Sequence, residues 1–165
     1  MSQDRAHPAA DRPRDDDPPR RVIVAGFGPV GRSVTEQLTA AGVATTIVDL
    51  NPHAAAVQHR LRREIVLGDV TDPAVLTDAG IQSAAALILA IPDERAAVRA
   101  CRVARKLNPD LFIAARTNFV SQGLLASEAG ADHVTVEEIV TAEAMKQAVV
   151  HALLGEGGEE VVRGS

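Results

Sequence analysis

The chain has 165 residues, of which 46% are hydrophobic, which is enough for one domain with its own core. Its net charge of −5 argues against a nucleic-acid partner, and its single cysteine, Cys101, excludes an intrachain disulfide and a CxxC metal site. Tyr and Trp are absent, so the core must consist mainly of Ala, Val, Leu and Ile, which suits parallel strands between alanine-rich helices.

The two ends of the chain differ in composition from the middle. Residues 1–20 hold five Asp, four Arg and four Pro with almost nothing to bury, and they are predicted to form a disordered tail. They lack the apolar segment of a signal peptide, which favours a cytoplasmic protein. Residues 155–165 (GEGGEEVVRGS) are predicted to be a second flexible tail, so the folded domain is expected at residues 21–154.

Between the tails, apolar runs alternate with helix signals. The runs predict strands at residues 21–26, 44–49, 64–68, 84–91, 111–116 and 132–136. Asn51, Asp72 and Asp93 precede predicted helices, and a long last helix is expected at residues 137–154. The wholly apolar run at 84–91 indicates a central strand and is too short to span a bilayer. This alternation predicts an α/β protein with a Rossmann-like, doubly wound sheet of six parallel strands and helices on both faces.

A glycine-rich turn follows the first predicted strand. Residues 26–31 (GFGPVG) form a GxGxxG motif between that strand and the first predicted helix, which is the context the motif requires. Gly26 would permit the tight turn, Gly28 would let the backbone approach a phosphate, and Gly31 would let helix pack on strand. The free amides of the helix N-terminus favour an anion there. The turn therefore predicts a phosphate site, with a ligand-free glycine turn as the alternative.

An acidic residue ends the second predicted strand. Asp49 lies 18 residues after Gly31, where a carboxylate accepts hydrogen bonds from ribose hydroxyls. A carboxylate also repels a 2′-phosphate, and Leu50 and Asn51 follow it instead of Arg, which disfavours NADP. The alternative is that Asp49 is a simple turn acid.

Several stretches beyond the glycines resemble the RCK family, also called KTN or TrkA-N domains. The stretches are VIVAGFGPVGR (22–32), IVDLNP (47–52), GDVTDP (68–73), GI (80–81), ALILAIPDE (86–94), IAAR (113–116) and AGADHVTVE (129–137). The resemblance covers residues 21–154. It implies a nucleotide-sensing regulatory domain, not an enzyme, that controls a membrane potassium or cation channel, a Trk/Ktr-type uptake system or a Kef-type antiporter from the cytoplasmic face of the membrane.

The resemblance also implies a set of ligand-binding residues. The glycine turn would hold phosphate, Asp49 would bind the ribose, Asp69 and Val70 would flank adenine, and Arg116 would approach the phosphates from across the cleft. The complete set is Gly26, Phe27, Gly28, Pro29, Val30, Gly31, Asp49, Leu50, Asp69, Val70, Ala90, Ile91 and Arg116.

Two departures from the family pattern bear on the ligand. Pro29 stands where many members carry an Arg that helps hold polyphosphate, so strong ATP binding is disfavoured and NAD(H) or AMP is favoured, with ADP and ATP as alternatives. Val136 stands where many members have Pro before an acid, here Glu137, which binds a divalent cation in some relatives. One acid with no other visible ligand predicts no metal site.

Two further helices carry surface patterns. Arg95, Arg99, Arg102 and Lys106 share one face of a predicted helix, and a solvated face is favoured over a docking surface. The last helix is predicted to contact a second copy in a homodimer or higher ring, as in RCK relatives, with packing on its own sheet as the alternative.

Two other functions remain open from the residues alone. A small NAD-dependent oxidoreductase would share the cofactor half, but the chain has no Tyr and only Lys106 and Lys146 as lysines. A ligand-free assembly scaffold is the third alternative, and the intact glycines with Asp49 argue against it.

Overall fold

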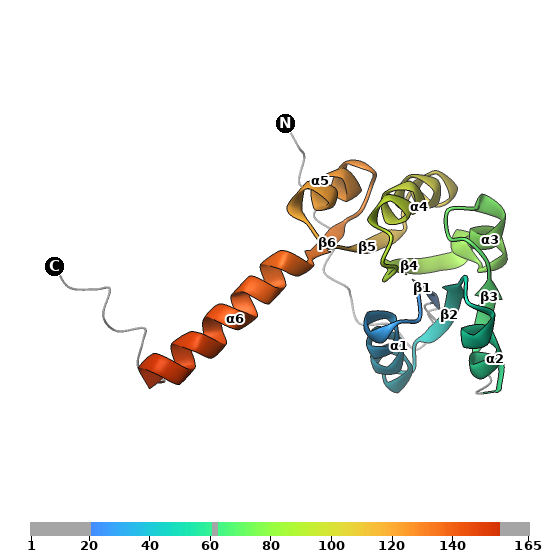
Figure 1. Ribbon diagram of the computed structural model, residues 1–165. Helices are drawn as coiled ribbons and strands as arrows, with labels where there is room; N and C mark the ends of the chain where they lie inside the picture. Colours follow the sequence, from blue (N-terminus) through green and yellow to red (C-terminus); the bar gives the residue numbers. More distant parts are fainter. Residues whose placement is uncertain (1–20, 61–62, 156–165) are drawn as a thin grey trace.

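The sheet is the centre of the computed structural model, which describes residues 21–60 and 63–155. Its strands are β1 (Arg21–Ala25), β2 (Ala44–Asp49), β3 (Glu64–Leu67), β4 (Ala84–Leu89), β5 (Phe112–Thr117) and β6 (His133–Val136). All paired strands are parallel, in the order β3-β2-β1-β4-β5-β6 (Figure 1). The predicted six-stranded, doubly wound sheet is confirmed, and β4 is central as its apolar sequence indicated. The tail predicted at 1–20 and residues 156–165 of the tail predicted at 155–165 lie outside the described residues.

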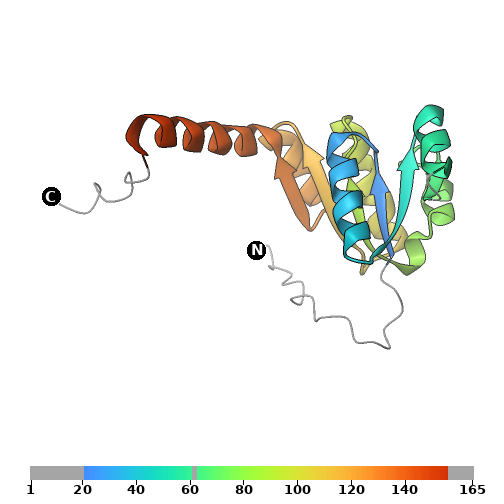
Figure 2. The same ribbon diagram turned by 90° about the horizontal axis from the view of Figure 1, so that it is seen from below.

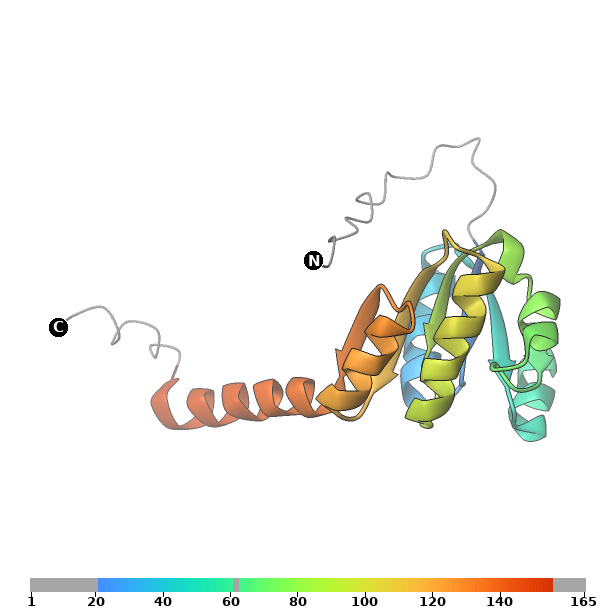
Figure 3. The same cartoon turned by 90° about the horizontal axis from the view of Figure 1, so that it is seen from above.

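Helices cover both faces of the sheet. They are α1 (Pro29–Ala40), α2 (Pro52–Arg60), α3 (Pro73–Asp78), α4 (Glu94–Leu107), α5 (Val120–Glu128) and α6 (Glu137–Leu154), with a short 3₁₀ turn, η1 (Ile81–Ser83). The views from below and above place α1 and α2 on one face and α3, α4 and α5 on the other (Figures 2 and 3). This arrangement follows from right-handed crossovers on either side of the β1–β4 switch point.

The helix starts follow from the residues before them. The Asp72 carboxylate accepts a hydrogen bond from the amide of Ala74 at 2.8 Å, and that of Asp93 accepts one from Ala96 at 2.9 Å. These side chains satisfy amides that a helix N-terminus leaves unpaired. Among the described residues no side chain caps α1, whose N-cap is Gly28. The first turn of α1 therefore has amides that no capping side chain in the described part of the chain satisfies.

Some predicted boundaries are wrong by a few residues. The strand predicted at 84–91 ends at Leu89. The amide of Ala90 still donates to the carbonyl of Ala25 at 2.8 Å, and the chain then leaves β4. The helix that follows β5 begins at Val120, since Phe119 is still extended. The 3₁₀ turn was not predicted. It follows Gly80, whose φ of +83° favours glycine.

The core lies mainly between the sheet and α3, α4 and α5. Ala97, Ala100, Cys101 and Ala104 share one face of α4 and are fully buried. Burial raises the pKa of the Cys101 thiol to about 11, so it behaves as a small apolar side chain. Small residues on this face let α4 lie close to β4 and β5.

Arg105, in the last turn of α4, is hydrogen-bonded to the chain segments that precede β5 and β6. Its Nη1 donates to the carbonyls of Pro109 and Leu111 at 2.6 and 2.8 Å. Its Nη2 donates to the carbonyl of Gly130 at 2.7 Å and to the carboxylate of Asp132 at 2.8 Å. This one guanidinium satisfies three loop carbonyls that no regular ladder pairs.

The last helix leaves the body of the domain. α6 follows β6 and projects away from the sheet, and none of its residues is buried (Figures 1 and 3). In the part of the chain that the structure describes, no helix covers β5 and β6 on the face that carries α1 (Figure 2). Packing of this helix on its own sheet, the alternative weighed from the sequence, is not what the structure shows.

Within the described residues, no helix has both the length and the apolar content needed to cross a membrane.

Candidate functional site

A cleft of about 630 Å³ opens at the carboxyl ends of the strands. The loops after β1, β2, β3 and β4, the start of α4 and the end of β5 form its walls. Its lining residues are Gly26, Phe27, Gly28, Pro29, Val30, Val48, Asp49, Leu50, Asn51, Gly68, Asp69, Val70, Ala90, Ile91, Pro92, Asp93, Ala96, Arg99 and Arg116. All but one of the sequence-predicted site residues therefore lie in one cleft. The exception is Gly31.

The glycine turn forms the floor of the cleft. Gly26 has a φ of +87°, and a Cβ there would lie 3.1 Å from the carbonyl of Ala90, so both conformation and space favour glycine. A Cβ on Gly28 would meet nothing within 4 Å, which leaves the backbone open to the cleft. A Cβ on Gly31 would lie 1.8 Å from the carbonyl oxygen of Gly26. Gly31 is buried under the turn, so it permits helix packing and does not line the cleft.

Asp49 links the glycine turn to the end of β2. Its Oδ2 accepts a hydrogen bond from the amide of Phe27 at 2.7 Å, and its Oδ1 accepts one from the amide of Asn51 at 2.7 Å. The side chain also lines the cleft. Each carboxylate oxygen can accept more than one hydrogen bond, so Asp49 holds the turn and still presents acceptor capacity to a ligand. Asp49 is therefore both a turn acid and a residue that lines the cleft.

Asp69 follows β3 at the mouth of the cleft. Its Oδ1 accepts hydrogen bonds from the amide and the hydroxyl of Thr71, both at 2.8 Å. These bonds, with a smaller contribution from the positive charge of Arg99, hold the pKa of Asp69 below its usual value. Asp69 is therefore a fixed negative charge next to Val70, whose side chain is buried.

Arg116 lies near the end of β5, on the opposite side of the cleft from Asp49. Its Nε is 2.5 Å from Oε1 of Glu137, the first residue of α6, and its Nη2 is 3.4 Å from Oδ1 of Asn118. The Nε–H nevertheless has no hydrogen-bond partner of good geometry among the described residues. The contact with Glu137 is therefore an ion pair with poor hydrogen-bond alignment.

The sequence did not predict the contribution of α4 to the site. Asp93, Ala96 and Arg99 line the cleft, and Arg99 had been assigned to a solvated row of cations. All four cations of that row are exposed, but Arg99 is also on the turn of α4 that meets the cleft. The signal that could have found it is position, because the first two turns of a helix after a central strand border the cleft.

A second cavity of about 570 Å³ lies between α1, the open face of β4 and β5, and the base of α6. Val30, Ala90 and Arg116 line both cavities, so the two cavities are neighbours. Glu137, Val140 and Thr141 contribute the α6 side of the second cavity. In residues 21–60 and 63–155, no three His, Cys, Asp or Glu side chains lie together as a metal-binding group.

The TrkA-N domain family model matches residues 22–137. The chain therefore belongs to the TrkA-N domain family, and the resemblance seen in its motifs is confirmed. Among curated relatives, a putative K(+) efflux antiporter KefB of Alkalimonas amylolytica is 34% identical over 137 residues, covering 82% of this chain and 20% of the relative. The glutathione-regulated potassium-efflux system protein KefC of Cronobacter sakazakii is 30% identical, covering 70% of this chain and 18% of the relative. The chain spans about a fifth of these relatives.

Solved structures agree with the fold. The TrkA-N domain of the inner membrane protein ybaL from Escherichia coli superposes with a TM-score of 0.77 at 26% identity, covering 81% of this chain and 98% of that domain. The Shewanella denitrificans Kef CTD in AMP-bound form gives 0.72 at 26% identity, covering 84% of this chain and 83% of its own. The GsuK channel bound to NAD, at 24% identity and 0.64, covers 79% of this chain and 23% of its own and shows the shared fold alone.

Proposed function

We propose that this chain is a nucleotide-sensing regulatory domain or subunit of a potassium or other cation transport system, working at the cytoplasmic face of the membrane. The observation that carries the proposal is the cleft, in which the glycine turn, Asp49, Asp69 and Arg116 come together at the switch point of the sheet. A family relative was solved with AMP bound, and the efflux relatives support potassium as the ion.

The polar groups of the cleft fit the parts of an adenine nucleotide. The uncapped first turn of α1 and the open backbone at Gly28 suit a phosphate, which a helix N-terminus attracts. Asp49 can accept hydrogen bonds from ribose hydroxyls. The exposed side chain of Leu50 and the region of Asp69 and Val70 provide the border of the cleft for the base.

The charge of the cleft favours ligands with a small net negative charge. Asp49, Asp69 and Asp93 line it, against two cations, Arg99 and Arg116. Because Pro29 supplies no charge, a triphosphate would lie near more carboxylates than guanidinium groups. NAD(H) is the preferred ligand, followed by AMP, and ADP and ATP rank lower for this reason.

Regulation, not catalysis, is proposed because the described residues that line the cleft include no His, Lys, Tyr, Cys or Ser. Lys106 and Lys146 are not among the residues that line the cleft. A small oxidoreductase would need a proton donor next to its carbonyl substrate. The scaffold alternative leaves the intact turn and the open cleft unexplained.

A second copy of the chain is proposed to cover α6. Ile139, Val140, Met145, Val149 and Leu153 of this helix are all at least half exposed. The open face of β5 and β6 lies beside the base of the same helix (Figure 2). Exchange of α6 between two copies would bury both surfaces and give a homodimer or a higher ring, which would act on a membrane channel or antiporter.

Nucleotide binding is tested by calorimetry and thermal unfolding with NAD, NADH, NADP, AMP, ADP and ATP. A ligand at a hundred times its dissociation constant should stabilise the protein by about 2.7 kcal/mol, a rise of several degrees in Tm. Asp49→Ala should abolish the rise. Arg102→Gln, on the same helix as Arg99 but outside the cleft, should not. If none of the six ligands shifts the wild-type Tm, the nucleotide function is wrong.

The dimer is tested by light scattering after size exclusion. The wild type should have twice the mass of one chain, and the double variant Val149→Asp, Leu153→Asp should have the mass of one. Gln147→Asp adds charge at a polar position of the same helix and serves as the control. A monomeric wild type at micromolar concentration would overturn this part of the proposal.

A further inference from the structure

The guanidinium of Arg116 is shared between the cleft and the base of α6. Resting on the nucleotide function above, we propose that Glu137 and the phosphate of a bound nucleotide compete for Arg116. Phosphate binding then releases Glu137 and loosens the attachment of α6 to β5. The ligand would thereby alter the helix that the domain offers to its partners.

The position of Arg116 makes such competition physically direct. Its side chain lines both the nucleotide cleft and the second cavity, and 22% of it is exposed. On the second-cavity side it is paired with Glu137, whose side chain is 42% exposed. One guanidinium carries one positive charge, so an anion on either side weakens its attraction for an anion on the other.

The geometry of the ion pair favours exchange of partners. Nε of Arg116 is buried next to Glu137, yet its N–H lacks an aligned acceptor among the described residues. The bond from Nη2 to Asn118 is long, at 3.4 Å. A phosphate can offer two oxygens in the bidentate arrangement that guanidinium groups prefer. A phosphate could therefore give Arg116 an aligned pair of hydrogen bonds, which Glu137 does not give its Nε.

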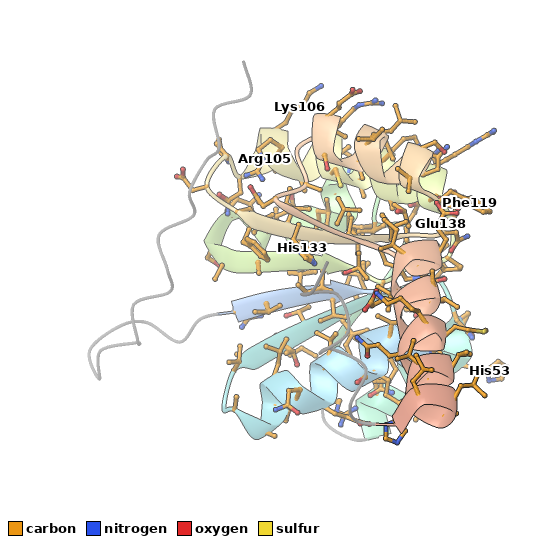
Figure 4. The ribbon with its side chains drawn as sticks, turned by 90° about the vertical axis from the view of Figure 1, so that its left-hand side faces the viewer. His53, Arg105, Lys106, Phe119, His133 and Glu138 are labelled. Carbon is orange, nitrogen blue, oxygen red and sulfur yellow. The ribbon has the colours of Figure 1, made fainter. Side chains whose placement is uncertain are left out.

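The base of α6 has few other attachments. The amide of Glu138 donates to the carbonyl of Asn118 at 3.2 Å, and the amide of Val120 donates to Oε1 of Glu138 at 2.9 Å. Figure 4 shows Glu138 and Phe119 together at this end of α6. Because no residue of α6 is buried, contacts at its first turn determine its direction. Asn118 is two residues from Arg116, so a change at Arg116 reaches these bonds directly.

The affinity test compares Glu137→Gln with wild type, using AMP and, as a probe without phosphate, adenosine. Glu137→Gln should bind AMP about threefold to tenfold more tightly, as expected for a partly screened coupling, and adenosine with unchanged affinity. Glu138→Gln is the matched control. It removes a neighbouring charge but keeps an oxygen for the amide of Val120, and it should leave both affinities unchanged.

The second readout is hydrogen exchange at the amides of Val120 and Glu138, which report the attachment of α6. AMP should accelerate their exchange in the wild type and not in Glu137→Gln, and adenosine should accelerate it in neither. A role of Glu137 that is only structural would not make these amides respond to phosphate.

Each other result has a definite meaning. If Glu137→Gln and Glu138→Gln tighten AMP binding equally, or if Glu137→Gln weakens it, competition for Arg116 is wrong while the nucleotide function stands. If AMP binds the wild type without changing exchange at Val120 and Glu138, release of α6 is wrong. If the wild type binds no nucleotide, both proposals fail.

Discussion

The helices α4 and α6 are the two longest in the domain, and their surroundings are opposite. α4 buries Ala97, Val98, Ala100, Cys101 and Ala104 against the sheet and carries its cations on the outer face. α6 has 18 residues rich in apolar side chains and buries none of them. Apolar content therefore does not decide which helix is buried within a single copy of the chain.

The difference comes from the place of each helix in the chain. α4 connects β4 to β5, so a parallel pair of strands requires it to cross back over the sheet. α6 follows β6, and within the described residues no further strand pairs beside β6 and draws α6 onto the open face of β5 and β6. The apolar face of α4 is thus covered by its own chain, whereas the apolar side chains of α6 stay exposed in the described structure. Four experiments compare the two helices, from the largest expected effect to the smallest.

The rate of thiol labelling should show the largest difference between the two helices. Cys101 on α4 is fully buried and its pKa is raised to about 11, so it should react only through unfolding. The variant Val149→Cys places a thiol on exposed α6. In Cys101→Ala background it should react at least about a thousandfold faster than Cys101 does in the wild type. Both proteins should carry a dimer-breaking substitution on α6. Equal labelling rates in stopped-flow measurements would contradict the expected difference in exposure between the two helices.

Removal of one cation from each helix should affect stability unequally. Arg105→Ala removes the donor to three carbonyls and the ion-pair partner of Asp132, whose carboxylate keeps the amide of Ile113. It should lower the free energy of unfolding by about 2–4 kcal/mol. Lys146→Ala breaks an exposed pair with Glu143 and should cost less than about 0.5 kcal/mol. Urea denaturation measures both values, and similar losses would show that α6 is held as firmly as α4.

Enlarging one alanine on each helix compares their packing. Ala104→Leu must insert three carbons into a filled core and should destabilise by about 1–3 kcal/mol. Ala148→Leu, on exposed α6, should change the free energy of unfolding by less than about 0.5 kcal/mol. A large loss from Ala148→Leu in the monomeric variant would mean that α6 packs on its own domain.

The smallest effect concerns two carboxylates whose pKa values are lowered. The hydrogen bond from Lys146 is the largest cause for Glu143, whereas Arg99 is a minor cause for Asp69, after the bonds from Thr71. Lys146→Met should therefore raise the pKa of Glu143 more than Arg99→Gln raises that of Asp69. Carboxyl NMR titration measures both.

The sign of their pH dependence follows from the direction of these shifts. A folded pKa below the unfolded value of an ordinary carboxyl stabilises the protein at pH above that value, and the contribution is lost as the pH falls through the folded pKa. Each substitution should thus reduce the loss of unfolding free energy on acidification, and it should do so only in the acidic range where these carboxylates become protonated. The expectation is wrong if Arg99→Gln raises the pKa of Asp69 more than Lys146→Met raises the pKa of Glu143.

The sequence by itself determined most of the local structure. Apolar runs located all six strands and capping residues located α2, α3 and α4, because these signals act over a few residues. The GxGxxG spacing with Asp49 indicated the cleft, because the order of strand, helix and strand brings these residues to one edge of the sheet. The family motifs correctly placed Asp69, Val70, Ala90, Ile91 and Arg116 at one edge of the sheet, since parallel strands bring their carboxyl ends together.

Only the tertiary structure decided the features that depend on distance between elements. Gly31 lies under the turn and not in the cleft, Arg99 reaches the cleft from α4, and Arg116 pairs with Glu137 across from β5 to α6. The exposure of α6 was likewise undecided by its sequence, which suits burial on either its own sheet or a second copy. Local patterns specify which face of an element is apolar, but the surface that covers that face is set by the path of the whole chain.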